Sequence, residues 1–180
     1  MSQDKGGEMG KGIRPDWYVE SLFTISPEAF KAHGVTGLLL DIDNTLVPNH
    51  VPDADERVIT FISRMQAAGI RLAILSNASA HRKTLFNRPL GLPVVSRALK
   101  PFRKGYLEGL SLLSLPPEAV AMVGDQLFTD IWGANAAGIR SLLVMPMNRS
   151  EPWYVRLKRL LERMVMGGMK PSPSLPEPES

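Results

Sequence analysis

Two aspartates, Asp41 and Asp43, follow directly after a largely apolar run at residues 35–40 that contains one glycine. An apolar run without alternation is typical of a parallel strand that is buried on both faces. A strand that ends in Asp-x-Asp places both carboxylates at the carboxyl edge of a sheet, where open α/β folds hold their ligands. Carboxylates this close repel each other, so a divalent cation with oxygen ligands is their natural partner. A turn that only caps the next helix is the alternative interpretation.

Polar residues with possible chemistry also follow the later predicted strands, namely Ser76, Asn77, Lys100, Asp125 and Asp130. Each has a simpler interpretation when it is taken alone: a strand end, a helix cap, a solvated lysine or a turn. In a parallel sheet, however, all of these strand ends lie along one edge. The group then combines acids, a hydroxyl and a cation, which favours one shared site.

The elements that position these residues alternate between strand and helix along the chain. In the predicted helix over residues 53–68, Val58, Phe61, Ile62 and Met65 recur at helical spacing, and Gly69 ends the helix. Repeated strand–helix units predict an α/β fold with a parallel sheet, helices on both faces and right-handed connections. Strands are expected at residues 35–40, 70–75, 93–95, 119–123 and 139–145, and helices at 53–68, 80–87, 101–113, 127–137 and 151–166.

Length and composition set the limits of this interpretation. The 180 residues suffice for one well-packed domain, which we expect over residues 13–166. We expect residues 1–12 to form a flexible leader and residues 167–180 a disordered, Pro-rich tail. The absence of cysteine excludes disulfides, thiolate zinc sites and cysteine nucleophiles. A net charge of +3 is too weak to indicate nucleic acid, so none is expected as a partner.

The four polar groups, taken in order, resemble the motifs of the haloacid dehalogenase-like (HAD) hydrolases. D-x-D-x-T corresponds to residues 41–45, the Ser and Lys motifs to Ser76 and Lys100, and G-D-x-x-x-x-D to residues 124–130. The residues of these motifs are most similar to those of the YqeG-type phosphatases of subfamily IIIA. These in turn resemble the mitochondrial phosphatidylglycerophosphate phosphatases. The resemblance covers about residues 13–166 and implies a Rossmann-like fold with three α/β/α layers.

The resemblance also implies roles for the acids. Asp41 would be the nucleophile that forms an aspartyl-phosphate, and Asp43 would be the general acid and base. Asp41, the main-chain carbonyl of Asp43 and Asp125 would bind Mg²⁺. Asp130 would support the metal indirectly or through water. An Asp at the second position of the motif marks the phosphatases of the family, which favours hydrolysis over a long-lived phosphoenzyme.

The same resemblance assigns the groups that would contact the phosphate. The Ser76 hydroxyl and the main-chain N–H groups of Ile42 and Asn77 would donate hydrogen bonds to the phosphoryl oxygens. Lys100 would supply positive charge to Asp41 and to the phosphoryl group. Thr45 would orient Asp43.

The spacing of the motifs leaves no room for a cap domain. Only 33 positions separate Asp43 from Ser76, and 24 separate Ser76 from Lys100, and both intervals are filled by predicted elements. A capless site is open, which favours a bulky partner that covers the site itself, such as a lipid headgroup, a protein or a nucleic-acid end. We expect phosphatidylglycerophosphate, by resemblance alone. A soluble sugar phosphate, a nucleotide, a phosphoprotein, or more remotely a non-enzymatic phospho-accepting receiver module, stay open as alternatives.

The expected last helix, 151–166, has an apolar stripe beside a basic one. It could pack on the sheet with its arginines in solvent, or lie on an anionic membrane surface. The apolar side of residues 17–30 leaves a similar choice between covering a sheet edge and docking on a membrane. No apolar run approaches the length of a membrane span. We therefore expect a cytoplasmic protein, with peripheral contact to the inner face of the membrane as an option. The oligomeric state stays open.

Overall fold

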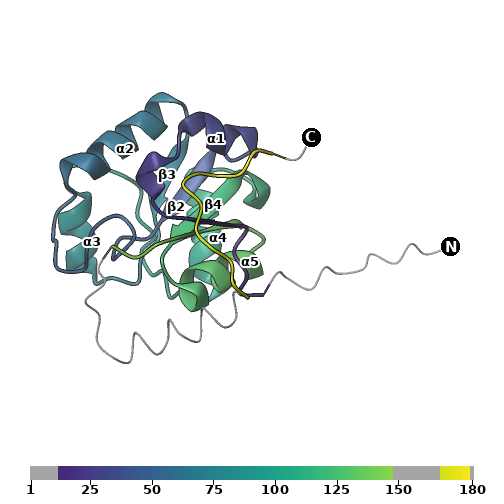
Figure 1. Ribbon diagram of the computed structural model, residues 1–180. Helices are drawn as coiled ribbons and strands as arrows, with labels where there is room; N and C mark the ends of the chain where they lie inside the picture. The colour runs from purple at the N-terminus through teal and green to yellow at the C-terminus, as the bar shows by residue number, and fades with distance from the viewer. Residues whose placement is uncertain (1–11, 148–166, 179–180) are drawn as a thin grey trace.

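Figure 1 shows the computed structural model of the chain, which describes residues 12–147 and 167–178. Five parallel strands form one sheet in the order β1-β5-β4-β2-β3. The central strands β2 and β4 are buried along their whole length, as their continuous hydrophobicity predicts. The strands are β1 (Trp17–Val19), β2 (Gly37–Leu40), β3 (Arg71–Ile74), β4 (Val120–Gly124) and β5 (Arg140–Val144).

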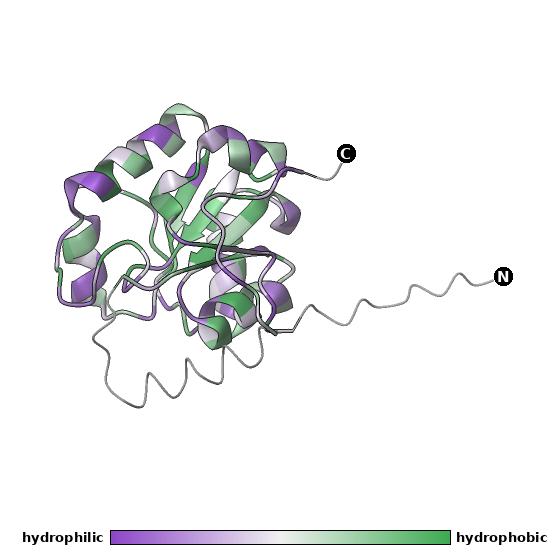
Figure 2. Ribbon diagram, in the orientation of Figure 1, coloured by the Kyte–Doolittle hydropathy of each residue, from purple (hydrophilic) through white to green (hydrophobic). Residues whose placement is uncertain are grey.

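Helices cover both faces of this sheet, and the hydrophobic colouring in Figure 2 concentrates on the strands between them. One apolar cluster joins α1 and α2 to the sheet, and a second joins α4 and α5 to its other face. The expected three-layer arrangement with a parallel sheet is confirmed. The helices are α1 (Pro27–Ala32), α2 (Glu56–Ala67), α3 (Ala80–Asn87), α4 (Arg103–Leu113) and α5 (Trp132–Ala136), with the 3-10 turns η1 (Leu22–Thr24) and η2 (Pro117–Ala119) and the π-helical turn η3 (Leu127–Ile131).

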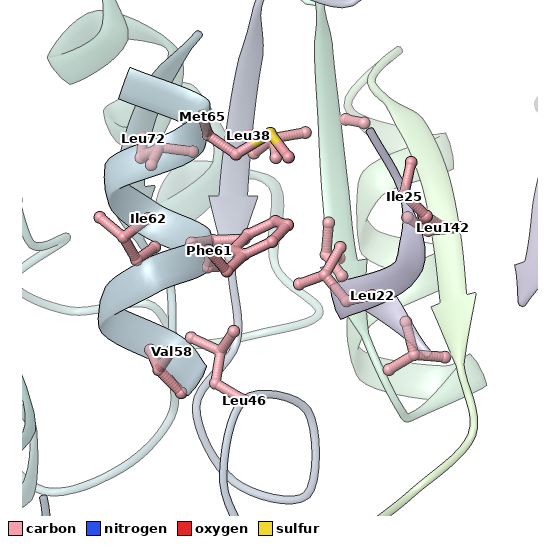
Figure 3. Packing of buried hydrophobic residues seen from close by; sticks show 14 of the residues in the cluster. Leu22, Ile25, Leu38, Leu46, Val58, Phe61, Ile62, Met65, Leu72 and Leu142 are labelled. Carbon is pink, nitrogen blue, oxygen red and sulfur yellow. The ribbon is translucent and has the colours of Figure 1, made fainter. Parts of the chain in front are cut away.

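Helix α2 shows how local sequence fixes an element of this core. The Asp55 carboxylate caps the helix by accepting a hydrogen bond from Val58 N at 2.9 Å. The buried stripe that includes Phe61 faces Leu38 of β2 and Leu22 (Figure 3). Each such side chain stabilises the fold by roughly 1.5–3 kcal/mol on burial. The helix ends before Gly69, whose φ of +81° suits a residue without a side chain.

Two expected elements differ from the structure, and a segment whose role stayed open forms a strand. Residues 17–19, for which an edge role stayed open, form β1 and pair with β5, so this segment covers the sheet edge. The expected strand 93–95 makes only a bridge between Val94 and Ile74, because it is too short to continue the ladder. The expected helix 127–137 divides into η3 and α5. The expected helix 151–166 and residues 1–11 of the expected leader lie outside the described residues.

The described part of the Pro-rich tail makes specific contacts with the domain. Ser172 N donates to Tyr18 O, and Glu20 N donates to Ser172 O, both at 2.9 Å. Edge strand β1 offers these otherwise unpaired backbone groups, and the buried Leu175 adds an apolar anchor. Prolines prevent a regular strand here but not an extended segment with a few specific contacts. None of the described helices is long and apolar enough to cross a bilayer.

Candidate active site

The loop after β2 buries the side chain of one motif aspartate and leaves that of the other partly exposed. Asp41 N donates to Val123 O at 3.0 Å, which extends the pairing of β2 with β4 and buries the Asp41 side chain. The chain then turns tightly, because Leu46 N donates to Ile42 O at 2.9 Å. The Asp43 side chain keeps about a third of its surface exposed, at 34%. One acid therefore lies at the base of the site and the other at its mouth.

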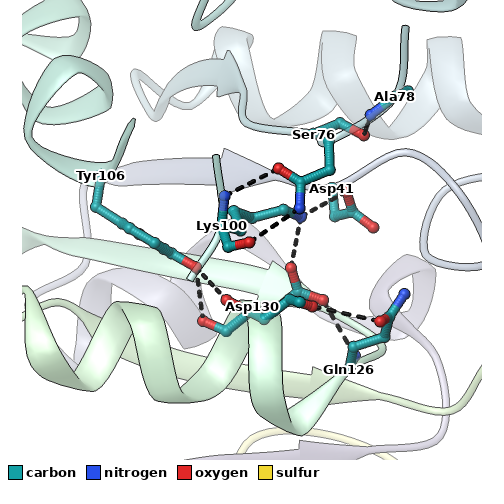
Figure 4. A network of polar contacts seen from close by, with 9 residues as sticks. Asp41, Ser76, Ala78, Lys100, Tyr106, Gln126 and Asp130 are labelled. Atoms are coloured by element: carbon teal, nitrogen blue, oxygen red, sulfur yellow. Dashed lines mark hydrogen bonds and ion pairs between the residues drawn. The ribbon is translucent and has the colours of Figure 1, made fainter. Parts of the chain in front are cut away.

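Lys100 bridges two buried carboxylates. Its Nζ atom lies 2.7 Å from Asp41 Oδ1 and 2.6 Å from Asp130 Oδ1 (Figure 4). Burial acts to lower the pKa of Lys100, but the charges of Asp130 and Asp41 outweigh it and hold the pKa above its usual value. Lys100 is therefore a fixed cation that orients Asp41.

An ion pair and several hydrogen bonds fix Asp130 and its backbone. Its second carboxylate oxygen accepts a hydrogen bond from Gln126 N at 3.0 Å, and the Tyr106 hydroxyl donates to the carbonyls of Thr129 and Asp130. Burial raises the pKa of Asp130 to about 6, with Lys100 opposing and Asp41 reinforcing the shift. A Cβ atom on Gly124 would overlap the Asp130 carboxylate, so the motif needs glycine there.

Three carboxylates, those of Asp41, Asp125 and Asp130, converge in this site. One oxygen of each lies within 4.8 Å of the others, and all three side chains are buried. Buried carboxylates with a single lysine between them carry excess negative charge, and an all-oxygen set suits a hard divalent cation such as Mg²⁺. The residues therefore fit the expected metal, and the Asp130 carboxylate belongs to the same cluster as those of Asp41 and Asp125.

Ser76 and Asn77 follow β3, and the Asn77 side chain makes a contact that the sequence did not predict. Ser76 Oγ is buried and accepts from Ala78 N at 3.2 Å, so its own hydrogen remains to be donated. Asn77 Oδ1 accepts from Lys100 N at 2.9 Å, and Asn77 Nδ2 donates to Lys100 O at 3.1 Å. This reciprocal pair fixes the backbone from which Lys100 enters the site.

Asp43 is oriented by a residue that sequence reasoning missed. Arg82 Nε and Nη2 lie 3.2 and 3.0 Å from Asp43 Oδ1, and Arg82 Nη1 donates to Pro52 O. The Thr45 hydroxyl, which was expected to orient Asp43, is buried and has no hydrogen-bond partner within residues 12–147 and 167–178. Arg82 lies in the first turn of α3, six positions after Ser76, and that position was the only signal in the sequence.

The chain matches known proteins in sequence and in fold. A family model described as HAD-hydrolase-like matches residues 98–151. The "Probable phosphatase YqeG" of Bacillus subtilis is 36% identical over 160 residues, which cover 89% of this chain and 93% of that protein. The deoxy-D-mannose-octulosonate 8-phosphate phosphatase of Haemophilus influenzae, in its cobalt-bound form, superposes with a TM-score of 0.51 at 15% identity, covering 77% of this chain and 91% of that one. This likeness shows the fold alone.

A more distant relative carries a more specific name. The chloroplastic phosphatidylglycerophosphate phosphatase 1 of Chlamydomonas reinhardtii is 30% identical over 144 residues, which cover 74% of this chain and 54% of that protein. This chain therefore spans about half the length of that relative.

Proposed function

Because the chain belongs to the HAD-like hydrolases, together with the YqeG-type phosphatases, and is itself a phosphatase, we propose that it cleaves phosphate monoesters through an aspartyl-phosphate on Asp41. The observation that carries this proposal is the ion pair of 2.7 Å between Lys100 Nζ and Asp41 Oδ1 at the base of an acidic site. The pair orients Asp41 through Oδ1 and leaves its second oxygen for attack on phosphorus.

In the first step, an Asp41 oxygen bonds to phosphorus while the bond from phosphorus to the ester oxygen breaks. Lys100 and the Ser76 hydroxyl stabilise the negative phosphoryl oxygens, together with the main-chain N–H groups of Ile42 and Asn77. Asp43, at the mouth of the site, donates its proton to the departing alkoxide.

In the second step, Asp43 takes a proton from water as that water attacks the phosphorus of the aspartyl-phosphate. Inorganic phosphate leaves and the Asp41 carboxylate is restored, so that Asp43 ends protonated, as it began. Arg82 holds Oδ1 of Asp43 throughout, which leaves Oδ2 for both proton transfers.

The acidic cluster supports a magnesium site in this mechanism. Asp41, Asp125 and the main-chain carbonyl of Asp43 would hold the cation, with Asp130 beside them. When bound, Mg²⁺ neutralises the phosphate and orients it for in-line attack.

The proposed substrate is phosphatidylglycerophosphate, hydrolysed to phosphatidylglycerol. Two observations support it: the relative that is named for this reaction, and intervals between the motifs that hold only loops, α2, β3 and α3 and so leave the site uncapped. A lipid headgroup embedded in a surface can shield an open site from water, which a small metabolite cannot do. A soluble phosphate ester is the alternative. The receiver module has no support from the relatives, whose names are those of phosphatases.

Phosphate release from a panel of substrates tests the proposal. The panel comprises phosphatidylglycerophosphate in vesicles, an aryl phosphate, sugar phosphates and nucleotides, each with Mg²⁺ and with EDTA. We expect magnesium-dependent release with a preference for the lipid. Equal or better turnover of a soluble ester would overturn the lipid assignment, and full activity in EDTA would overturn the metal.

Substitutions test the covalent step. Asp41→Asn should abolish turnover, whereas Asp43→Asn should form the phosphoenzyme slowly and hydrolyse it more slowly still. Intact mass measurement after acid quenching should then detect a covalent phosphoryl group on Asp43→Asn and never on Asp41→Asn. Asp55→Asn, at the helix cap of α2, is the matched control and should keep normal turnover. Full activity of Asp41→Asn would contradict the mechanism.

A further inference from the structure

The turn that carries Lys100 exposes two large apolar side chains beside the active site. Phe102 N donates to Leu99 O at 2.9 Å, which closes a turn with Lys100 and Pro101 at its centre. Lys100 points inward to Asp41 (Figure 4). Phe102 and Leu99 are 71% and 55% exposed, the highest values for large hydrophobic side chains in the described part of the chain. The most exposed apolar groups therefore flank the active-site lysine.

Hydrogen bonds from two other residues hold the segment that carries these exposed side chains. The Asn77 side chain is hydrogen-bonded to both the N–H and the C=O of Lys100. The buried Lys83 donates from Nζ to Val95 O and Ser96 O at 3.1 and 2.9 Å, which fixes the chain that leads into the turn. Two large apolar side chains held in water by a fixed backbone indicate a binding surface rather than a loose loop.

Positive charge surrounds these apolar side chains. Arg97, Arg103 and Lys104 are exposed on both sides of Leu99 and Phe102. More widely, residues 57–107 contain ten Lys and Arg and no Asp or Glu, although the whole chain has a net charge of only +3. Apolar groups that can enter the acyl boundary, next to cations that attract anionic headgroups, are the combination that binds proteins to an anionic bilayer.

We propose that residues 97–104, which we call the Lys100 turn, dock on the surface of an anionic lipid bilayer. Leu99 and Phe102 insert below the headgroups, and Arg97, Arg103 and Lys104 contact lipid phosphates. Docking in this way places the open mouth of the site at the headgroup layer. The inference deepens the proposed function and rests on it only for the identity of the substrate. It involves described residues alone and is independent of the expected helix 151–166.

Vesicle flotation of the full chain tests this surface directly. Vesicles of phosphatidylcholine, with and without phosphatidylglycerol, are compared at low and high salt. We expect binding to the anionic vesicles that weakens at high salt. Leu99→Ser and Phe102→Ser should each weaken it about tenfold, and Arg103→Gln by roughly fivefold.

A leucine on α4, the helix that follows the Lys100 turn, provides the matched control. Leu112 is 42% exposed near the opposite end of α4, where the neighbouring Leu113 O accepts a hydrogen bond from Arg71 at the start of β3. Leu112→Ser should bind anionic vesicles like the unmodified chain. If Phe102→Ser and Leu99→Ser also bound normally, or if Leu112→Ser lost as much binding as they do, the docking surface would be wrong.

Activity measurements separate this inference from the proposed substrate. With Phe102→Ser, hydrolysis of phosphatidylglycerophosphate in vesicles should fall, while release from a water-soluble aryl phosphate should stay normal. Normal hydrolysis of vesicle lipid by this variant would overturn the docking surface and leave the substrate standing. Binding to anionic vesicles through the turn, without hydrolysis of the lipid in vesicles or detergent, would support docking and overturn the substrate.

Discussion

Arg82 holds the proposed acid and base of the site, with its Nη2 atom 3.0 Å from Asp43 Oδ1. The contact joins the first turn of α3 to the loop after β2, 39 residues earlier in the chain. Because Arg82 Nε reaches the same oxygen and Nη1 donates to Pro52 O, the guanidinium fixes both the position of Asp43 and its own. The mouth of the site therefore depends on a residue outside the four motifs.

Arg82→Ala should lower kcat by roughly 10–100-fold, because a displaced Asp43 transfers protons poorly. KM should change less. Arg82→Lys should recover only part of the loss, since an ammonium cannot reproduce the planar two-nitrogen contact. Steady-state kinetics on an aryl phosphate measures both constants. Arg64→Ala is the control, because Arg64 donates to the carbonyls of Phe23 and Ile25, away from the site. A rise in KM with unchanged kcat would show that Arg82 binds substrate instead of positioning Asp43.

Asn77→Ala should reduce both stability and activity. Its side chain satisfies the N–H and the C=O of Lys100, so its loss leaves two polar groups unpaired and frees the lysine backbone. We expect a loss of about 1–3 kcal/mol in the free energy of unfolding and at least a tenfold fall in kcat. Urea unfolding and phosphate release measure the two effects.

Asn87 offers a control with the same geometry. Its Nδ2 donates to Leu92 O at 2.8 Å and its Oδ1 accepts from Leu92 N at 2.9 Å, at the end of α3. Asn87→Ala should cost similar stability and leave kcat unchanged. Equal losses of kcat in both variants would mean that Asn77 acts on the fold alone.

The sequence predicted the elements with strong local patterns and the residues with motif spacing. Helix α3 has its expected bounds, and α2 follows its apolar stripe and its Asp55 cap. Asp41, Ser76 and Asp130 follow β2, β3 and β4, whose carboxyl ends share one edge of the sheet. Lys100 joins them from the turn that Asn77 holds. Periodicity and topology were sufficient for this part of the interpretation.

Contacts between side chains far apart in the chain could not be predicted in the same way. Arg82 and Asn77 gain their roles from the packing of α3 and of the Lys100 turn, and an arginine or asparagine in isolation usually indicates a solvated surface. The contacts of Ser172 depend on the free edge of β1, which three residues with little alternation did not reveal. The roles of Arg82 and Asn77 and the contacts of the tail with β1 are therefore visible only in the tertiary structure.

Gly124→Ala should disable the site by displacing Asp130. The added methyl group would overlap the Asp130 carboxyl group, which is fully buried and cannot move aside without losing its bonds to Lys100 and Gln126 N. We expect a loss of about 2–4 kcal/mol in stability and little remaining activity. Thermal unfolding and phosphate release provide the measurements. Gly69→Ala is the control: its φ of +81° costs about 1 kcal/mol, but nothing lies within 4 Å of an added Cβ, so activity should persist. Retained activity in Gly124→Ala would show that Asp130 is dispensable.

The metal-free protein should become more stable as the pH falls from about 7 to about 5. Burial raises the pKa of Asp130 to about 6, above its ordinary value of 3.8. Between these values the folded protein binds more protons than the unfolded chain, so the free energy of unfolding rises as the pH decreases through this window, by on the order of 1 kcal/mol. Physically, Asp41 and Asp130 share one ammonium, and the first proton removes their excess charge.

Urea unfolding in EDTA across this pH range tests the expectation. Asp130→Asn should remove the rise in the free energy of unfolding at lower pH. Asp55→Asn, at an exposed helix cap, is the control and should keep that rise. Magnesium should act in the opposite direction, because a cation and a proton compete for the same carboxylates. Its apparent affinity, followed as the gain in thermal stability, should therefore decrease below about pH 6. A metal-free stability that fell steadily over the window would show that Asp130 stays ionised in the fold and that Lys100 alone balances both acids.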